Sequence, residues 1–174
     1  ALAGAFTYTQ VESRIRADVE EHLDSLAANF AGDTIATWLE QKRSLARALA
    51  AYPAMREMQV EEAQRIINAT YAAAPADYNN IGFFDATGLM VADIAGAAGK
   101  GNLMKGNPWG QEVYDGRRTQ SPELLSSVNN RPIFVLYERV LDDSGAVVGV
   151  VGVGTNLNAI GERLEEREFG QTGE

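Results

Sequence analysis

The chain contains no cysteine among its 174 residues, and it contains a single histidine. The absence of cysteine excludes disulfide bonds, thiolate nucleophiles and zinc sites with thiolate ligands. The histidine, His22, lies among charged residues of a predicted helix, where neither a catalytic triad nor a metal site has a visible set of partners. We therefore expect His22 to be an exposed helix residue, and we predict neither a metal ion nor a cofactor.

Long hydrophobic runs are also missing from the sequence. No apolar stretch approaches the roughly 20 residues that span a bilayer, and no signal peptide is visible. The chain opens directly in a helical pattern, which fits either a natural start or the remainder of a preceding membrane helix. Composition does not choose between these two origins.

Basic residues are fewer than acidic ones, 15 against 24, which gives a formal net charge of −9. A field of this sign repels the phosphates of nucleic acids, so we do not expect nucleic acid among the partners. The glycines Gly149, Gly152 and Gly154 lie inside a predicted strand and not at a strand-to-helix turn, so they do not form a nucleotide-binding loop. Because no nucleophile–base pair is visible either, we predict that the chain is not an enzyme.

What the sequence does contain is enough apolar material, 45% of the residues, to build the core of a domain. In the first third of the chain, apolar residues recur at spacings of three and four, as in amphipathic helices. This pattern stops at Tyr52-Pro53 and again at Pro75, because proline restricts the residue before it and ends a helix. Residues 1–74 are thus predicted to be an N-terminal helical segment, with helices over residues 11–30, 35–49 and about 55–73.

After Pro75 the pattern changes to short runs rich in β-branched and aromatic residues, which predict strands. Valine makes up most of residues 147–153, as expected of a central strand that is covered on both faces. Turn residues mark two hairpins, and Pro108 favours a short helix that begins there and ends near residue 114. The turns are DATG at 85–88 and DDSG at 142–145, and the predicted strands cover residues 78–85, 89–93, 117–121, 132–141 and 146–157.

Helices followed by about five strands with hairpin connections indicate an α+β fold with an antiparallel sheet. The short helix falls between the second and third predicted strands, so we expect it to cover the sheet as a lid. A curved sheet under a lid encloses a ligand pocket, the usual form of a small-molecule site. The apolar stripe over residues 11–30 either packs on this domain or pairs with a second copy of the chain.

Five short segments stand in a fixed order along the chain: WLEQKR at 38–43, YNNIGFFDATG at 78–88, RPIFV at 131–135, DDSG at 142–145 and VGVVGV at 148–153. In this order and spacing they resemble the Cache family of extracytoplasmic sensor domains, and the resemblance covers nearly the whole chain. It implies a PAS-like Cache module over residues 75–168. The loop at residues 169–174 is similar to the point where some members begin a second module, so it is a candidate start of a truncated one.

The resemblance implies an extracytoplasmic ligand-sensing domain of a transmembrane signalling receptor, either a chemoreceptor or a sensor kinase. Such a domain binds a small polar metabolite and relays a conformational change to the membrane through its terminal helices. The implied location is the periplasmic or extracellular face of the inner membrane, with flanking transmembrane helices and a cytoplasmic signalling domain in the full-length protein. A homodimer is one expected assembly, and a ligand-free structural or dimerisation module of the same fold is the alternative function.

The ligand-contacting positions depart from those of family members that bind amino acids. Around the tryptophan that matches Trp109, and on two later segments, such members carry an arginine, a tyrosine, two aspartates and a second aromatic residue. This chain has other residues at those positions: Asn107, Gly110, Glu123, Leu125 and Gly154. The carboxylate clamp and the ammonium acceptor are therefore missing or rebuilt, which argues against ordinary amino-acid sensing.

The first candidate ligand-binding residues lie in and beside the predicted lid. Trp109 can stack on a ligand through its indole ring, or it can be a core aromatic that anchors the short helix. Lys105 can neutralise a ligand carboxylate, and Asn107 offers both a donor and an acceptor, although both also suit a solvated loop. Glu123, which follows Ser121 at the expected mouth of the pocket, selects an amine or a hydroxyl-rich ligand if it points inward, and is otherwise a surface residue.

Tyr114, Tyr137 and Asp93 are second-rank candidates, and the sequence leaves open which face of its strand Tyr137 occupies. Trp38 lies on a helical apolar stripe and is expected in the core. The predicted ligand is a small polar metabolite. It is either a carboxylate held by the lysine and the asparagine of the lid, or an amine held by the glutamate.

Overall fold

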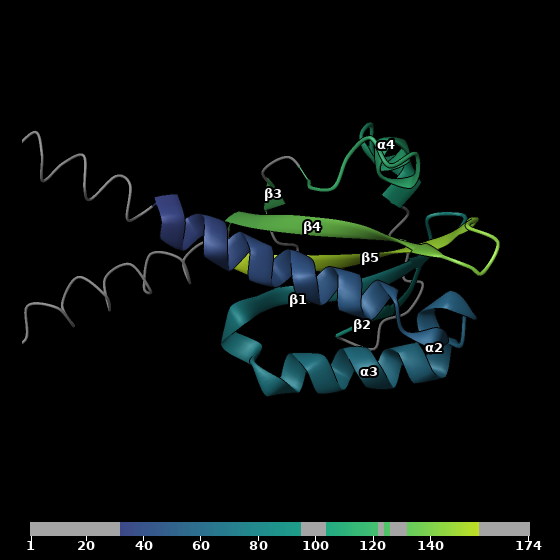
Figure 1. Cartoon of the computed structure of the whole chain (residues 1–174), viewed down its shortest axis with the longest axis horizontal. Coiled ribbons are helices and arrows are strands. Elements are labelled where there is room, and N and C mark those ends of the chain that lie inside the picture. Colours follow the sequence, from purple (N-terminus) through teal and green to yellow (C-terminus); the bar gives the residue numbers. More distant parts are fainter. Residues whose placement is uncertain (1–31, 95–103, 122–123, 126–131, 157–174) are drawn as a thin grey trace, which may run out of the picture. The chain divides into compact units, whose positions relative to one another are not determined.

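The computed structural model describes residues 32–94, 104–121, 124–125 and 132–156 (Figure 1). The chain divides into two compact units, residues 1–38 and residues 39–174. Residues 32–38 of the first unit are helical and include Trp38, which is buried as predicted. The predicted helix over residues 11–30 with His22, the candidate residue Glu123 and the loop at 169–174 lie outside the described residues.

The second unit is built on a five-stranded sheet with the order β2-β1-β5-β4-β3. Every neighbouring pair of strands is antiparallel. This confirms the predicted α+β fold with about five hairpin-connected strands, and it places the valine-rich strand at the centre. The strands are β1 Tyr78–Asp85, β2 Met90–Asp93, β3 Leu124–Leu125, β4 Pro132–Leu141 and β5 Val147–Asn156.

The prediction of a strand over residues 117–121 is wrong, because the third strand comes later, at Leu124–Leu125. The predicted segment does run beside β4. The N–H of Ser121 donates to the carbonyl of Val135 at 2.8 Å, and the N–H of Tyr137 donates to the carbonyl of Thr119 at 2.8 Å. The pairing amounts to one isolated bridge, between Gln120 and Leu136, which is too short to form a strand.

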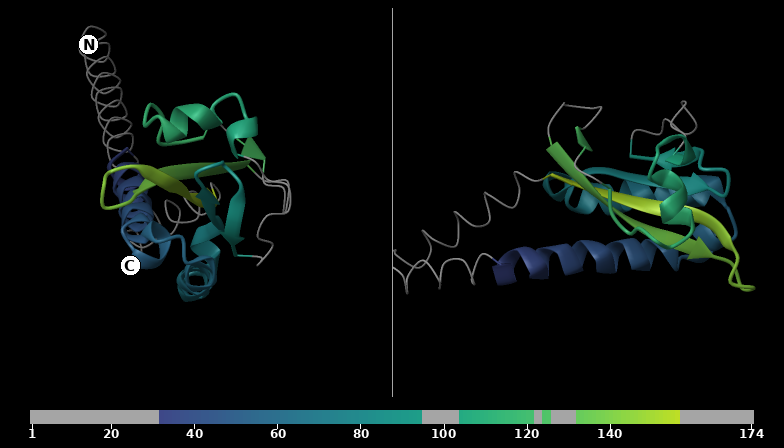
Figure 2. Two further views of the ribbon diagram at one scale, coloured as in Figure 1. Left: turned by 90° about the vertical axis from the view of Figure 1, so that its right-hand side faces the viewer. Right: turned by 90° about the horizontal axis from the view of Figure 1, so that it is seen from above.

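Register decides which residues share a face of the sheet. On β5, Val151 and Val153 point to one face, while Val150, Gly152 and Gly154 point to the other, because side chains alternate along a strand. The first face packs against helical residues 39–50, α2 Pro53–Arg56 and α3 Val60–Ala73, and we call it the helix face. The opposite face packs against α4 Gly110–Tyr114, and we call it the lid face (Figure 2).

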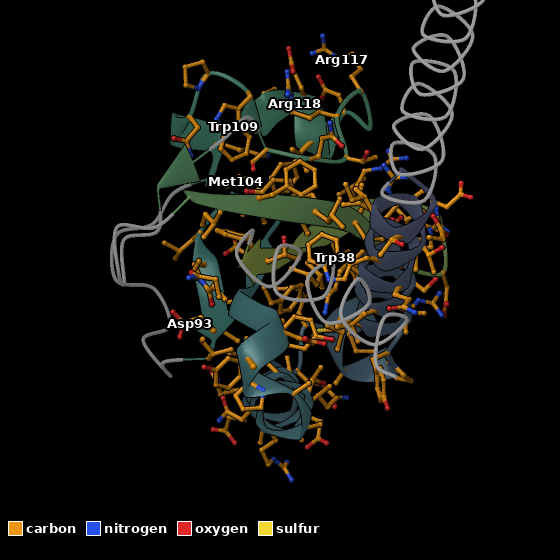
Figure 3. The ribbon with its side chains drawn as sticks, turned by 90° about the vertical axis from the view of Figure 1, so that its left-hand side faces the viewer. Trp38, Asp93, Met104, Trp109, Arg117 and Arg118 are labelled. Atoms are coloured by element: carbon orange, nitrogen blue, oxygen red, sulfur yellow. The ribbon has the colours of Figure 1, made fainter. Side chains whose placement is uncertain are left out.

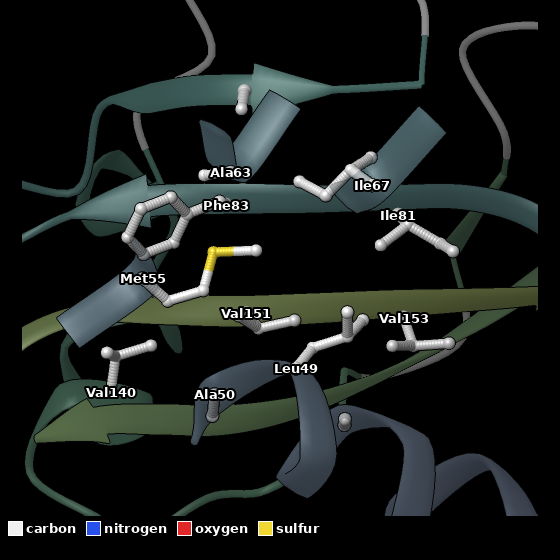
Figure 4. Packing of buried hydrophobic residues seen from close by; sticks show 12 residues of the cluster. Leu49, Ala50, Met55, Ala63, Ile67, Ile81, Phe83, Val140, Val151 and Val153 are labelled. Atoms are coloured by element: carbon white, nitrogen blue, oxygen red, sulfur yellow. The ribbon is translucent and has the colours of Figure 1, made fainter. Parts of the chain in front are cut away.

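The main core lies between the helix face and the helices that cover it (Figure 4). Phe83, Ile81 and Met55 are fully buried there. Complete burial of one such side chain contributes about 1.5–3 kcal/mol to the free energy of unfolding. This cluster fixes the sheet to its helical cover and leaves the lid face for other contacts. Its buried members are Ala46, Leu49, Ala50, Met55, Ala63, Ile67, Ile81, Phe83, Ala92, Val140, Val151 and Val153.

The single helix predicted over about 55–73 is two helices, α2 and α3, separated at Met58. Met58 has a φ of 54°, in the left-handed region. The N–H of Gln59 donates to the carbonyl of Ala54 at 2.8 Å, and the N–H of Met58 donates to the carbonyl of Met55 at 3.2 Å. These two bonds form a Schellman motif, which ends a helix and is usually marked in a sequence by glycine. Because this position is methionine and not glycine, the sequence does not indicate that the helix ends here. The side chain of Met58 packs against the main core.

On the lid face, a short 3-10 turn η2 Met104–Gly106 and helix α4 lie over the half of the sheet that carries the two hairpin turns (Figure 1). This confirms a lid helix, although α4 begins at Gly110, two residues after the predicted start. Gly110 is required at the junction, since a Cβ there would lie 2.0 Å from the carbonyl oxygen of Met104. The lid therefore packs as one piece with the turn before it.

The two hairpin turns use the same chemistry. Asp85 Oδ1 accepts hydrogen bonds from the N–H of Thr87 at 2.8 Å and the N–H of Leu89 at 3.0 Å. Asp142 Oδ1 accepts from the N–H groups of Ser144 and Ala146, both at 2.9 Å. Each turn ends at a glycine with positive φ, 92° at residue 88 and 84° at residue 145. The DATG and DDSG signals thus predict turn geometry as well as turn position.

Both turn carboxyls should make the protein less stable in acid. Burial by itself raises the pKa of Asp85, but hydrogen bonds from Thr87, Leu89 and Gly88 outweigh it and lower the pKa below 3.8. Hydrogen bonds from the Ser144 side chain, and then from backbone N–H groups, lower the pKa of Asp142. A pKa that is lower in the folded chain gives stability that is present above pH 3.8 and lost as the pH falls through the folded value.

We expect the urea midpoint of the wild-type chain to fall between about pH 5 and about pH 3, and to fall less in the double variant Asp85→Asn, Asp142→Asn. Asparagine keeps the acceptor oxygen of the turn but does not titrate in this range. The variant therefore preserves the turn geometry and removes only the titration of the two carboxyl groups. Equal falls in the two proteins would show that other groups carry the acid sensitivity.

Candidate functional site

Two rows of paired residues cross the lid face between the part that α4 covers and the start of β1. The first row runs from Asp93 on β2 through Gly82 and Gly152 to Tyr137 on β4. The second row joins Asn80 on β1 to Gly154 on β5, and continues to Val135 on β4. Three of the central positions are glycine, so the backbone of the sheet itself forms the floor between the flanking side chains.

Tyr137 and Trp109 form a stack above this floor. Their ring centroids are 5.5 Å apart with an interplanar angle of 29°. Figure 3 labels Trp109 on the lid side of the sheet. The tyrosine ring in turn lies over Gly152, where a Cβ would come within 3.0 Å of it. Burial raises the pKa of Tyr137 above its ordinary value, so the phenol stays protonated and can donate a hydrogen bond. The structure thus places Tyr137 on the lid face and brings it together with Trp109.

The space directly beneath α4 is filled by side chains. Tyr114 is buried there, and its hydroxyl donates to the carbonyl of Asp85 at 2.6 Å. Burial and then the charge of Asp85 raise the pKa of Tyr114. Phe84, Met90, Met104, Val113 and Val150 complete this lid cluster, together with Tyr114 and Tyr137. A ligand on the lid face therefore has to lie further along the sheet, toward the start of β1.

Asn80 marks that end of the sheet. Its Oδ1 atom is buried and has no hydrogen-bond partner within the described residues. A bulge between Tyr78 and Asn80 sets the two side chains on opposite faces, with Tyr78 opposite Thr155 and Asn80 opposite Gly154. The Cβ of Asn80 lies 3.6 Å from the position that a Gly154 Cβ would take, which agrees with both residues being on the lid face.

Asp93 and Ser121 lie at the two edges of this surface. Asp93 is only 8% exposed, and its backbone N–H donates to Oε1 of Gln64 on α3 at 3.2 Å. Its register with Gly82 puts its carboxylate on the lid face. Ser121 is 3% exposed, and its Oγ accepts a hydrogen bond from the N–H of Val135 at 3.1 Å. The two residues therefore border the glycine floor from opposite sides of the sheet.

Lys105 and Asn107 lie at the other end of the lid. Lys105 Nζ donates to the carbonyl of Ala86 at 2.6 Å and sits 4.2 Å from the ring centre of Tyr114. Asn107 is exposed, and its backbone bonds to Met104 and Gly110 hold the junction of η2 and α4. The structure thus places Lys105 at the first hairpin turn and Asn107 at the junction of η2 and α4, and it brings neither of them to Asn80. Their part in ligand binding stays a prediction.

Asn80 is the residue that sequence reasoning missed. A visible signal exists, since the pair Asn79-Asn80 interrupts an otherwise aromatic and β-branched strand, with Gly82 two positions later. Gly154, where amino-acid-binding relatives were expected to carry aspartate, is the residue paired with Asn80. A side-chain acceptor is therefore present in this row, but on the neighbouring strand.

Two hollows in the described part of the chain are lined by residues other than Asn80 and the glycines of the floor. One, of about 430 Å³, is lined by residues that include Arg47, Arg56 and Asp143. The other, of about 260 Å³, lies beside β4, where the helix at 39–50, Thr119 and Tyr137 contribute to its lining. The arginines beside them are already paired, Arg47 with Glu40 at 3.1 Å and Arg56 with Asp143. These hollows hold no unpartnered buried polar atom, so we place the candidate site on the lid face.

Within the described ranges, no helix is both long and apolar enough to cross a bilayer. The same residues contain no group of three or more side chains suited to hold a metal ion.

The sequence matches the family model described as "Cache domain" over residues 7–174. Similar solved structures include the ligand-binding domain of the Pseudomonas fluorescens chemoreceptor CtaA in complex with L-isoleucine, with a TM-score of 0.66, 18% identity, and coverage of 85% of this chain and 60% of that one. The sensor domain of the V. cholerae histidine kinase DctB gives a TM-score of 0.63, 15% identity, and coverage of 83% and 58%. The ligand-binding domain of the Pseudomonas aeruginosa chemoreceptor PctC, in complex with GABA, gives a TM-score of 0.63 and 15% identity, with coverage of 84% of this chain and 68% of that one.

At these identities the likeness to solved structures is one of fold alone. The chain spans about six tenths of the length of the first chemoreceptor and kinase structures that it matches. A search of curated proteins finds no match to the sequence.

Proposed function

Because the chain belongs to the Cache domain family, we propose that it is the extracytoplasmic ligand-sensing domain of a transmembrane signalling receptor, a chemoreceptor or a sensor kinase. Its location is the periplasmic or extracellular face of the inner membrane. Flanking transmembrane helices and a cytoplasmic signalling domain complete the receptor, and the domain works as a homodimer. It binds and does not transform its ligand, so we assign it no enzymatic activity.

The observation that carries the proposal is the part of the lid face near the start of β1, where Asn80 lies beside the glycines of the floor. Gly82, Gly152 and Gly154 add no side chains of their own there. The Trp109–Tyr137 stack, whose tyrosine ring lies over Gly152, forms a wall beside the pair of Asn80 and Gly154. A small polar metabolite fits such a surface, since its apolar part can lie against the rings and its polar groups can reach Asn80. The ligand thus lies on the sheet beside the lid, toward the start of β1.

A path from this site to the helical cover starts at the bulge of β1. On the lid face Asn80 faces the ligand, and on the helix face Tyr78 contacts Lys42, whose Nζ lies 4.0 Å from the ring centre. Lys42 is buried and forms an ion pair with Asp77 at 3.2 Å. Ligand binding that reshapes the bulge therefore acts on the helix at 39–50. Couplings between linked sites are typically about 1–3 kcal/mol, and they equal the differential affinity of the ligand for the two states.

The domain boundaries follow the same proposal. Residues 75–168 form the PAS-like module, residues 1–74 the helical segment, and residues 169–174 the start of a second module. Residues 39–74, most of which are helical, belong to one compact unit with the sheet, so this part of the helical segment contributes to the fold as well as to signal transmission.

Thermal denaturation against a library of amino acids, amines, polyols and carboxylates tests the function. A ligand present at a hundred times its dissociation constant should stabilise the wild-type chain by about 2.7 kcal/mol. Trp109→Ala should weaken binding of that compound about tenfold or more, because it removes the aromatic wall, whereas Trp109→Phe should keep most of the affinity. Dissociation constants measured by calorimetry are compared, since Trp109→Ala also loses its stack on Tyr137 and thereby some stability.

A chain that no compound stabilises would contradict sensing and favour the alternative, a ligand-free structural or dimerisation module of the same fold.

A further inference from the structure

One buried polar atom on the lid face is left without a partner. Asn80 Oδ1 has no hydrogen-bond partner within the described residues. An acceptor that is withdrawn from water and left unpaired destabilises a fold, and native proteins keep few such groups without a functional reason. The position of this atom therefore needs an explanation beyond folding.

The local backbone shows that Asn80 is not held there by packing alone. The bulge at Tyr78–Asn80 turns its side chain to the lid face, beside Gly154. A regular strand would put Tyr78 and Asn80 on the same face, so the bulge separates the ring of Tyr78, which packs with the main core, from the amide of Asn80. Bulges concentrate beside functional sites because they re-aim a side chain in this way.

The chemistry of the Asn80 amide favours a ligand donor. Its Oδ1 atom can accept hydrogen bonds but cannot donate them. A ligand carboxylate would bring a second acceptor to this end of the surface and leave Oδ1 unpaired, whereas an N–H or O–H group would satisfy it.

We propose that Asn80 Oδ1 accepts a hydrogen bond from the bound ligand, and that the ligand therefore carries an N–H or O–H donor at the end that reaches β1. This inference rests on the proposed sensing function and goes beyond it by assigning a specificity-determining residue and the chemistry that it reads. An ammonium and a hydroxyl are two sources of the same donor. A ligand without a donor at this end is rejected, because it leaves the buried oxygen unpaired.

The first test changes the ligand. Each compound that stabilises the wild-type chain is compared by calorimetry with its N-trimethylated or O-methylated analogue, which has no donor at that atom, beginning with the set 4-aminobutyrate, 4-hydroxybutyrate and 4-(trimethylammonio)butyrate. Loss of the donor should weaken binding about tenfold or more. Binding of the amine alone identifies an ammonium as the donor, and binding of the hydroxyl compound identifies a hydroxyl. Equal affinity for methylated and unmethylated compounds would overturn the proposal.

The second test changes the protein. Asn80→Leu removes the acceptor and should weaken binding of a ligand with a donor about tenfold or more. Asn80→Asp keeps an acceptor and should still bind an amine. Without ligand, Asn80→Leu should raise the Tm by roughly 2–6 °C, because the unpaired buried oxygen is gone. A residue that is only structural would give the opposite, a lower Tm with unchanged affinity in the fraction that folds.

The outcomes separate this inference from the function on which it rests. If compounds stabilise the chain but bind equally well to wild type and Asn80→Leu, the assignment of Asn80 is wrong and the sensing function stands. If no compound of any class binds the wild-type chain, the sensing function itself fails.

Discussion

Replacing Phe83 by alanine should lower the free energy of unfolding by about 3–5 kcal/mol, which is the usual cost of emptying a buried phenylalanine site. Phe83 is fully buried in the main core, between the sheet and its helical cover (Figure 4). Its ring also lies across Gly149, where a Cβ would come within 2.7 Å of it. The neighbouring strand β5 has glycine at position 149, which leaves room for this ring. Because that position has no side chain, β5 cannot easily fill the cavity that Phe83→Ala would create.

Such a loss is a large part of the about 5–15 kcal/mol that holds a typical domain together. Urea unfolding followed by circular dichroism measures it, provided that the slope with denaturant stays unchanged. Leu141→Ala is a control on the same sheet, since Leu141 is 37% exposed and its truncation should cost about 0.5 kcal/mol or less. A Phe83→Ala variant as stable as this control would show that the main core is not packed as described.

The second large effect is expected at Gly110, where α4 meets η2. An added Cβ would stand 2.0 Å from the carbonyl oxygen of Met104 and 2.7 Å from its carbonyl carbon, and backbone atoms cannot turn aside as a flexible side chain can. Gly110→Ala should therefore separate α4 from η2 and cost at least about 1–3 kcal/mol, the range for overpacked sites. Because the Trp109 stack depends on this junction, ligand binding should be lost with it.

Trp109 and Trp38 are the two tryptophans of the chain. Fluorescence of a Trp38→Phe background reports Trp109 alone, and Gly110→Ala should shift its emission to longer wavelength as the ring leaves Tyr137. Gly32→Ala is the matched control, since Gly32 lies in a helix with no atom within 4 Å of the added Cβ, and alanine is the better helix former. Unchanged emission and stability in Gly110→Ala would mean that the lid is not seated on η2.

Much of the fold follows from local patterns in the sequence. The hairpin turns are readable because Asp85 and Asp142 bond to backbone groups only two to four residues away. The central strand is readable because continuous valines suit a strand that is buried on both faces. The helix break at Met58 is not readable from the sequence, since the left-handed residue is methionine and not glycine. The structure shows that Met58 packs against the main core, a contact that local spacing does not reveal.

Some residues of the candidate site can be selected from the sequence, and their role in ligand binding stays a prediction. Sequence reasoning selected both Trp109 and Tyr137, and the structure stacks them. It also selected Lys105, which the structure places against the carbonyl of Ala86 at the first hairpin turn. It passed over Asn80, because the face that a strand residue occupies depends on bulges and on pairing with distant strands.

The sequence by itself determined the kinds of element, their order and the two hairpin turns, because each of these depends on residues close together in the chain. Tertiary structure alone decided which side chains share the lid face. The partners in the row of Asn80, Gly154 and Val135 are separated by up to 74 positions, from 80 to 154, and register between strands brings them together. A bulge of one residue reverses the face of a side chain, and hydrogen bonding between strands, more than the local spacing of apolar residues, fixes where that bulge forms.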